Sequence, residues 1–284
     1  MDDRAVTYTT HDGRSVTFGA PGGSLHYFGS KFRDMVDWEW DEANGRAVGF
    51  GRKRLETVQL KVGIAADTDA EGMAMRNELR DLAEADVAAG QYGHLSVGEW
   101  SMRCMVVGCS TTKWHMGPRW AEMELKLLCE RACWVRERLT EYRQVKSAQQ
   151  SGGLDYPHGY PHDYGMDASL PELDNPAASA CGFLLRVYGP ASSPYVQIGD
   201  DVHKVDVEVP EGSILTVDCR DRSIVLRGEY GFVHNVFSKR QRGAEGSGTY
   251  VFQPVEPGSH EVAASGRFDF DLVLFEEASQ PEWN

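Results

Sequence analysis

A repeated tyrosine-proline segment near the middle of the chain sets the strongest limit on how this sequence folds. Tyr-Pro-His occurs twice, four residues apart, in the stretch from 155 to 165, and Tyr164 follows with the same spacing. Proline fixes its own φ and lacks an amide donor, so regular helices and central strands do not run through such a segment. We therefore expect two blocks, one on each side of this tyrosine-proline ladder.

Length and composition bound the class of protein. A chain of 284 residues is long enough for two domains with separate hydrophobic cores. No apolar run reaches the length of a membrane span, and the segment Met1–Arg4 lacks the basic and apolar regions of a signal peptide. We therefore expect a protein that is made and folded in a cytoplasm and has no membrane partner.

Charge is divided unevenly between the two blocks. Residues 1–146 carry 20 basic and 22 acidic side chains, a balance of −2, whereas residues 147–284 carry 9 and 21, a balance of −12. Because phosphate groups would be repelled, the second block is not expected to bind nucleic acid directly. Its acidic surface favours solubility and can attract a basic partner.

The six cysteines allow two interpretations. The pairs Cys104/Cys109 and Cys129/Cys133 are spaced closely enough to suggest a zinc site. Both pairs lie in alternating apolar sequence typical of strands, whereas zinc ligands commonly occupy glycine-rich turns with two residues between them. Buried free cysteines are the favoured interpretation, because cysteine is among the most frequently buried residue types.

Most of the first block alternates between polar and apolar residues, which predicts strands. Asp12-Gly13 is the turn of an expected hairpin over residues 7–18, and Asn44-Gly45 is a second turn signal. Further strands are expected at 37–41, 58–64, 93–97, 101–109 and 122–130, and the pattern over 134–139 fits a strand or a short helix. The region from 28 to 54 contains no motif that gives it a role.

One helix interrupts these strands. Thr68 and Glu71 form a capping-box pattern, and Gly90 stands where a helix would end. The spacing predicts a helix over residues 69–89 with an apolar stripe that packs against the core, formed by Met75, Leu79 and Leu82.

The second block is predicted to be a β-sandwich. Short apolar stretches separated by turn signals occur at 183–188, 195–198, 205–209, 213–218, 223–226, 250–252 and 268–275. Regularly spaced short strands of this kind are typical of antiparallel sandwiches.

No catalytic constellation is recognisable in the sequence. His260-Glu261 begins like a zinc-protease motif, but no second histidine follows at the required spacing. Acidic residues at predicted turns are expected to cap the backbone there, namely Asp200, Asp201, Asp218 and Asp221. The sequence therefore predicts no enzyme, no catalytic or metal-binding residues and no cofactor.

The two histidines of the ladder are candidate metal ligands only if the chain turns sharply between them. His158 and His162 are four residues apart, with Pro161 between them. In an extended chain they would be about 12 Å apart, at ~3.1 Å per residue. Two ligands of one metal each lie within about 2 Å of it. Only a tight turn at Gly159 would bring the two imidazoles together.

The favoured interpretation of the ladder is an assembly contact. Its tyrosine rings are flat and amphipathic, so they can lie against a neighbouring surface with their hydroxyl groups in water. We expect the ladder to fasten one domain to the other, or one subunit to the next, through Tyr156, Pro157, Tyr160, Pro161 and Tyr164.

Taken in order, these features resemble the distal tail (Dit) proteins of siphophages, the bacteriophages with long non-contractile tails. The ladder resembles that family's Tyr-Pro-x-x-Tyr-Pro-x-Asp-Tyr string, although histidines stand at 158 and 162. The helix with Arg76, Leu79 and Leu82 is followed by Gly93–Val97, which is similar to the family's Gly-x-Leu-x-Val hairpin. Arg103–Val107 then resembles its Lys-Cys-Tyr-Val strand. In the second block the matches by type and order are Tyr188-Gly189-Pro190, Pro194, Asp218, Asn235-Val236-Phe237, Phe252 and Pro257-Gly258.

The resemblance implies a mostly β architecture in two domains. It implies a tail-tube-like, ring-forming domain over 1–150, a β-sandwich or α+β fold with one helix. A tyrosine- and proline-rich linker would follow over 151–175, and a galectin-like β-sandwich over 176–284. Six copies would form a ring at the distal end of the virion tail, assembled in the host cytoplasm. The implied partners are the tail tube protein, the tail-tip hub or tail-associated protein and receptor-binding proteins, with DNA only passing through the lumen.

A carbohydrate-binding module is the alternative function, because the second block is expected to be galectin-like. Galectins bind sugar through a His-x-Asn-x-Arg strand and a stacking tryptophan. Here His234 and Asn235 are adjacent, and Trp283 stands at the end of the sequence, so the pattern departs from theirs. A hydrolase acting on cell walls is the third possibility, and it has no catalytic residues to support it.

Overall fold

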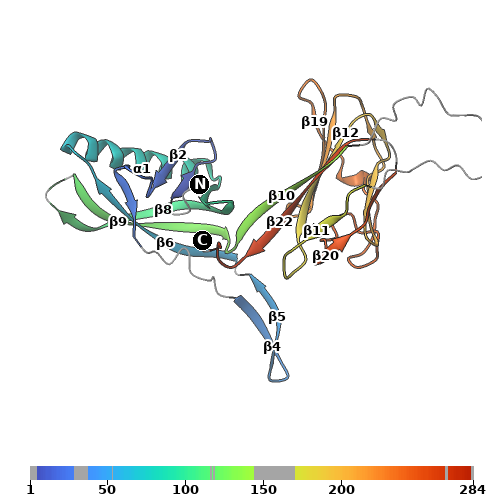
Figure 1. Cartoon of the computed structure of the whole chain (residues 1–284), viewed down its shortest axis with the longest axis horizontal. Helices are drawn as coiled ribbons and strands as arrows, with labels where there is room; N and C mark the ends of the chain where they lie inside the picture. The colour runs from blue at the N-terminus through green and yellow to red at the C-terminus, as the bar shows by residue number, and fades with distance from the viewer. Residues whose placement is uncertain are drawn as a thin grey trace, which may run out of the picture. The chain divides into compact units, whose positions relative to one another are not determined.

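The computed structural model describes residues 5–28, 38–52, 54–115, 117, 119–143, 170–265 and 268–282. The chain divides into two compact units, which are coloured by residue number in Figure 1. Unit 1 is Met1–Arg136 with Glu277–Asn284, and unit 2 is Glu137–Glu276. The chain therefore passes between the units twice, once within strand β10 (Trp134–Tyr142) and once within strand β22 (Phe270–Ala278).

Unit 1 is built on one antiparallel sheet. Its strands are β1 (Val6–Thr9), β2 (Ser15–Phe18), β3 (Leu25–Tyr27), β6 (Arg54–Ala65), β7 (Gly93–Val97), β8 (Trp100–His115) and β9 (Trp120–Arg131). They follow the order β3–β6–β9–β8–β7–β1–β2, and each neighbouring pair is antiparallel. The expected hairpin over residues 7–18 and the expected strands at 58–64, 93–97, 101–109 and 122–130 are confirmed. The ambiguous stretch over 134–139 is a strand, because it lies in β10.

The helix α1 (Asp69–Ala89) has the predicted limits. The Thr68 side chain accepts a hydrogen bond from the Glu71 amide at 3.2 Å, and Gly90 closes the last turn in the left-handed region at φ 62°. The capping box differs in one detail, because the Glu71 carboxylate accepts from the amide of Asp67, not of Thr68. These contacts satisfy backbone groups that a helix end leaves without partners.

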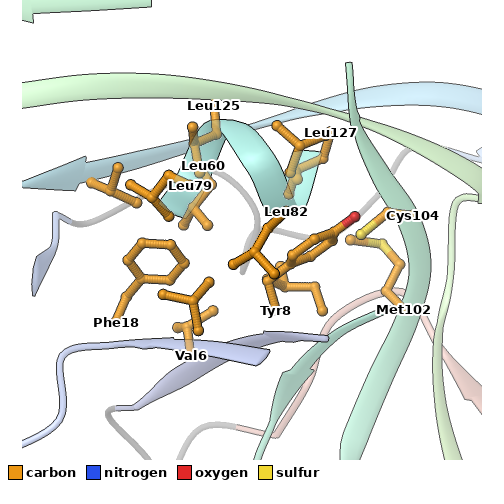
Figure 2. Close-up of a cluster of buried hydrophobic side chains, with 14 of the residues drawn as sticks. Val6, Tyr8, Phe18, Leu60, Leu79, Leu82, Met102, Cys104, Leu125 and Leu127 are labelled. Carbon is orange, nitrogen blue, oxygen red and sulfur yellow. The ribbon is translucent and has the colours of Figure 1, made fainter. Parts of the chain in front are cut away.

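The core of unit 1 lies between the sheet and α1. Figure 2 shows Leu79 and Leu82 of the helix packed with Val6, Tyr8 and Phe18 of β1 and β2. All five side chains are at least nine-tenths buried. At about 1.5–3 kcal/mol for each large apolar side chain, this cluster holds the helix to the sheet far more strongly than the caps do.

A buried carboxylate ties the end of α1 to β1. Asp86 is fully buried and accepts a hydrogen bond from the Tyr8 hydroxyl. It also accepts from the His11 amide at 2.9 Å, and its Oδ1 lies 2.7 Å from Nδ1 of His11. Burial, and then the bond to Asp86, raise the pKa of Tyr8 well above its ordinary value. Gly93 lies beside this network, where an added Cβ would be 2.3 Å from the carbonyl oxygen of Thr9.

Unit 2 is an antiparallel sandwich. One sheet follows the order β19–β18–β17–β12–β22–β10 and the other contains β15–β14–β21, with the short pairs β11–β20 and β13–β16 alongside. The strands not yet given are β11 (Leu173–Asn175), β12 (Gly182–Tyr188), β13 (Ala191–Ser192), β14 (Tyr195–Ile198), β15 (Asp201–Lys204), β16 (Glu208–Val209), β17 (Ile214–Asp218), β18 (Ser223–Arg227), β19 (Val233–Asn235), β20 (Gly258–His260) and β21 (Val262–Ala264). A single cluster of buried side chains draws on both sheets, as the predicted sandwich requires.

Two features of unit 2 matter for its stability. The ring of Tyr142 is fully buried and stacks on Phe270 with ring centroids 4.6 Å apart. Asp271 is buried and lies 2.6 Å from the Arg143 guanidinium, and it accepts a hydrogen bond of 2.5 Å from the Tyr188 hydroxyl. Asp271, which with Asp86 is one of the two buried carboxylates of the described chain, is therefore paired with an arginine that stays positively charged.

Two of the expected strands in the second block are wrong. The stretch 205–209 is not one strand, because the Val207 amide bonds to the Val205 carbonyl in a tight turn between β15 and β16. Residues 250–252 form a turn closed by the Gln253 amide on the Tyr250 carbonyl. Val251 is nevertheless fully buried, so its apolar character reflects the core and not strand pairing.

Candidate assembly surfaces

The tyrosine-proline ladder cannot be placed, because it falls outside the described residues. Its predicted contact residues Tyr156, Pro157, Tyr160, Pro161 and Tyr164 all lie in the stretch 144–169. The histidine pair of the same segment is also outside. The ladder's assembly role and the linker boundaries around it stay predictions.

A hairpin in the region that the sequence left without a role exposes aromatic side chains. Strands β4 (Trp38–Ala43) and β5 (Arg46–Arg52) pair with each other and with no other described strand. Asn44 and Gly45 form the two-residue turn, both with positive φ as that turn type requires. Figure 1 shows these two strands as an arm, called here the hairpin arm (Trp38–Arg52).

The hairpin arm exposes more large apolar side chains than is usual for an element that stays in contact with water. Trp40 is 60% exposed, Phe50 is 63% exposed and Val48 is 40% exposed. A two-stranded hairpin is marginally stable by itself, and clustered exposed apolar side chains mark an interaction surface. Strand β4 also carries Glu39, Asp41 and Glu42, so its surface combines aromatic and acidic groups.

A groove runs along the other side of the helix. It has a volume of about 680 Å³ and lies between α1, β8 and β9. Its apolar lining is Leu79, Ala83, Val87, Ala88, Val106, Val107, Met123 and Leu125, and its charged or polar lining includes Arg76, Arg80, Glu84, Cys109 and Thr111. We call this space the α1 groove. Val87 and Val107 are 50% and 42% exposed, so part of its apolar wall faces solvent.

One edge of β8 is open along this groove. Strand β7 pairs with β8 only from Trp100 to Cys104, and β9 pairs with the opposite edge from Cys104 onward. From Met105 to His115, no strand of the described chain pairs with the edge that β7 leaves. An open edge can accept an added strand.

The cysteine prediction is partly wrong at this groove. Cys104, Cys129 and Cys133 are buried as expected, whereas Cys109 is exposed. Cys109 lines the open α1 groove, where no described element covers it, and its Sγ lies 3.9 Å from the Met123 sulfur. Partial burial raises the pKa of the Cys109 thiol above its ordinary value.

The start of β19 and the loop before it expose apolar groups at an edge of unit 2. Tyr230 and Phe232 in the loop are 84% and 63% exposed, and Val233, the first residue of β19, is 59% exposed. The ring of Phe232 stacks on His234 with centroids 6.5 Å apart. Flat exposed rings of this kind can contact a protein or the face of a sugar.

Two of the acidic turn residues line a small cavity of unit 2. Asp200 and Asp201 line a cavity of about 210 Å³ with His203, Glu256 and His260. His203 is buried, its Nδ1 lies 3.0 Å from the Val251 carbonyl, and burial lowers its pKa. Within the described ranges, no group of three His, Cys, Asp or Glu side chains is placed to hold a metal ion. The helix that the structure describes is not long and apolar enough to cross a membrane.

The chain is similar in fold to known phage tail proteins. No family model and no curated protein sequence matches it. The Dit (gp 19.1) protein of phage SPP1, described as a paradigm of the hub adsorption apparatus in phages that infect Gram-positive bacteria, matches with a TM-score of 0.58. That match covers 95% of this chain and 98% of the SPP1 protein, at 10% identity.

A chain of the phage P2 baseplate in its activated conformation also has a TM-score of 0.58. The match covers 98% of this chain and 99% of the baseplate chain, at 12% identity. The baseplate structures with calcium and with strontium give the same values. The fold is therefore Dit-like over nearly the whole chain, as the resemblance in sequence implied.

Proposed function

We propose that this protein is a structural hub of a phage tail tip. In this role six copies form a ring that joins the tail tube to the baseplate or tail-tip proteins, with a lumen through which DNA passes. The proposal is supported by a fold match that spans nearly the full length of both chains. The proposed role is mechanical, and no described residue is given a catalytic part.

The observation that carries self-assembly is the hairpin arm. Trp40 and Phe50 are both more than half exposed on an element that pairs with no other described strand. Covering the exposed part of each ring contributes on the order of 2 kcal/mol. A neighbouring copy of the chain would supply that cover and would fix the arm in place.

Mass photometry and negative-stain microscopy of the purified protein test the proposal. We expect closed rings whose mass corresponds to six copies, formed either by the protein alone or on addition of the tail tube protein. A protein that stays monomeric at high concentration with tube protein present would contradict the hub role.

Paired variants locate the contact. Trp40→Ser with Phe50→Ser is expected to abolish rings while leaving the thermal unfolding transition in place, because both side chains lie outside the core. Tyr230→Ser with Phe232→Ser, an equally exposed aromatic pair in unit 2, is the matched control and should still form rings.

The proposed location and partners follow from the same role. The ring would occupy the distal end of the virion tail after assembly in the host cytoplasm, between the tail tube protein and the tail-tip hub or tail-associated protein. Receptor-binding proteins would attach to the acidic sandwich, since residues 147–284 carry a net charge of −12. We also propose that the ladder residues Tyr156, Tyr160 and Tyr164 fasten a domain or subunit. Their triple substitution by alanine should increase proteolysis of the segment 144–169 in assembled rings.

The second candidate is a carbohydrate-binding role for unit 2. Tyr230 and Phe232 are exposed rings on an edge of the sandwich, with His234 stacked on Phe232. Aromatic faces stack on sugar rings, and the imidazole could add a hydrogen bond. A glycan array with the full chain tests this role. Saturable binding that is lost in Tyr230→Ser with Phe232→Ser would favour it, and no binding would remove it.

A further inference from the structure

The hairpin arm and the α1 groove belong to the same unit, and both expose apolar side chains to solvent. The arm presents Trp40, Val48 and Phe50 on a thin two-stranded element. The groove presents Val87 and Val107 on the walls of a space of about 680 Å³. An apolar groove of this size is a surface that can accept the aromatic and aliphatic side chains of the arm.

The lengths of the two surfaces agree. Strand β4 has 6 residues and is therefore about 20 Å long at ~3.3 Å per residue. The helical wall of the groove runs from Arg76 to Ala88, which is about 18 Å at ~1.5 Å per residue. The open edge of β8 runs beside it. A strand in the groove could therefore pair with that edge while its side chains enter the groove.

Charge favours the same pairing. The arm's β4 strand carries Glu39, Asp41 and Glu42. The helical wall carries Arg76 and Arg80, together with Glu84. Arg76 donates to Thr111 at 2.9 Å, and Arg80 pairs with Asp81 at 2.7 Å while its side chain is still 57% exposed. An acidic strand entering beside these arginines would meet two positive groups at the groove's rim, where the nearby acidic groups are Glu84 and Asp81, the partner of Arg80.

We propose that the hairpin arm of one copy docks in the α1 groove of a second copy. This inference rests on the proposed self-assembly and adds to it the identity of the receiving surface. Val107 contacts the arm at the groove wall, and the acidic groups of β4 face the arginines of α1. Each copy offers one arm and one groove, so the contact is heterologous and can close into a ring.

Cys109 provides a native probe for this contact. It is exposed and lines the α1 groove, whereas Cys104, Cys129, Cys133 and Cys181 are buried. Cys219 is partly buried in unit 2, and Cys219→Ser removes it as a competing thiol. In this background Cys109 is the single exposed cysteine.

Disulfide mapping with this background tests the docking. Trp40→Cys, Val48→Cys and Phe50→Cys are each introduced, and the assembled protein is oxidised mildly. We expect at least one of the three to give covalent dimers and higher species on a non-reducing gel, with mass spectrometry locating the bond at Cys109. The product should vanish in Cys109→Ser. Val233→Cys in unit 2, with 59% exposure against 63% for Phe50, is the matched control and should not link to Cys109.

The outcomes separate this inference from the proposed function. Rings without any link to Cys109 would overturn the docking and leave the hub intact. Equal linking by Val233→Cys, or a link formed within a single copy, would also overturn it. Cys109 that stays open to thiol reagents in the ring and closes only when tube protein is added would assign the groove to that partner. A wild-type protein that never associates would remove both proposals.

A charge in the groove gives a second, non-covalent readout. Val107 is exposed enough for the fold to tolerate Val107→Asp, which places a carboxylate opposite the acidic strand β4 of the arm; the arm's basic residues, Arg46 and Arg52, are in β5. We expect at least about a tenfold weaker association, since about 1.4 kcal/mol is tenfold in affinity. Leu139→Asp, which is 55% exposed and outside the groove, should leave association unchanged. Unchanged association in Val107→Asp would count against the docking.

Discussion

Among the described residues each unit buries one carboxylate, but the two carboxylates are held in different ways. Asp86 in unit 1 is fully buried and is surrounded by the Tyr8 hydroxyl, the His11 amide and the His11 ring. Asp271 in unit 2 is held by the guanidinium of Arg143, whose side chain is 44% exposed, and by Tyr188.

The difference predicts how each unit responds to damage. Around Asp86 the Tyr8 hydroxyl is itself buried, so removal of the carboxylate leaves its proton without an acceptor, although its contact with the Val106 backbone remains. Around Asp271 the arginine can turn into solvent when its partner is lost. Leaving a buried group unsatisfied costs more than the bond itself contributes. Unit 1 should therefore be the more sensitive of the two.

The largest effect is expected for Asp86→Ala. It removes the acceptor that joins α1 to β1 and strands the Tyr8 hydroxyl, and we expect unit 1 to lose about 3–4 kcal/mol. Native-state hydrogen exchange of the α1 peptides reports this loss locally. Exchange in the β12 and β17 peptides of unit 2 is the internal control and should change little. An α1 that is as protected as in the wild type would show that the network contributes nothing.

Gly93→Ala should come next. The added Cβ would lie 2.3 Å from the Thr9 carbonyl oxygen and 2.7 Å from Oδ2 of Asp86, so backbone and network must both shift. We expect a loss of about 2–3 kcal/mol, typical of forcing an atom into a packed interior. Gly13→Ala has open space around its Cβ but a φ of +87°, so it should cost less, about 1 kcal/mol. Denaturant unfolding followed by the exchange of β7 peptides distinguishes the two.

Asp271→Ala should have a smaller effect than Asp86→Ala. The Arg143 head group is partly exposed already, so it regains water and the loss is limited to about 1–2 kcal/mol. Exchange of the β12 and β22 peptides measures it. If Asp271→Ala lowers the free energy of unfolding as much as Asp86→Ala does, then access of the remaining partner to water does not explain the difference between the two units.

Local signals explain which parts of the fold were predictable. The limits of α1 follow from Thr68 and Gly90, which act within one helical turn. Strand alternation identified β6, β7, β8 and β9 because each buries one face. By contrast, the partners of Asp86 are Tyr8 and His11, which are 78 and 75 residues away in sequence. No periodic pattern in the sequence relates residues that are so far apart, so the sequence alone does not predict the hydrogen bonds around Asp86.

The candidate site was less predictable than the fold. The alternation over 37–41 identified a strand, but a strand with aromatic residues normally predicts one buried face. Here every residue of β4 is exposed, because β4 pairs only with β5 among the described strands. The α1 groove and the exposure of Cys109 depend on where β7 stops pairing with β8. Those are properties of the register and not of any motif.

The smallest expected change is a gain in unit 2 from Tyr142→Phe. The Tyr142 hydroxyl is buried and has no hydrogen-bond partner among the described residues. Its removal should therefore stabilise unit 2 by about 1 kcal/mol near neutral pH, while the ring still stacks on Phe270. Burial raises the pKa of Tyr142 from 10.0 to about 12. The unfolded chain gives up this proton at a lower pH than the folded protein does, so the stability of the wild type falls as the pH rises from 10 to 12. Phenylalanine has no proton to lose in this range, so the advantage of the variant in denaturant unfolding should widen between pH 8 and pH 11. Tyr230→Phe, at an 84% exposed position, is the control and should show neither the gain nor the widening. An advantage that is constant with pH would mean that the Tyr142 hydroxyl reaches water in the folded protein.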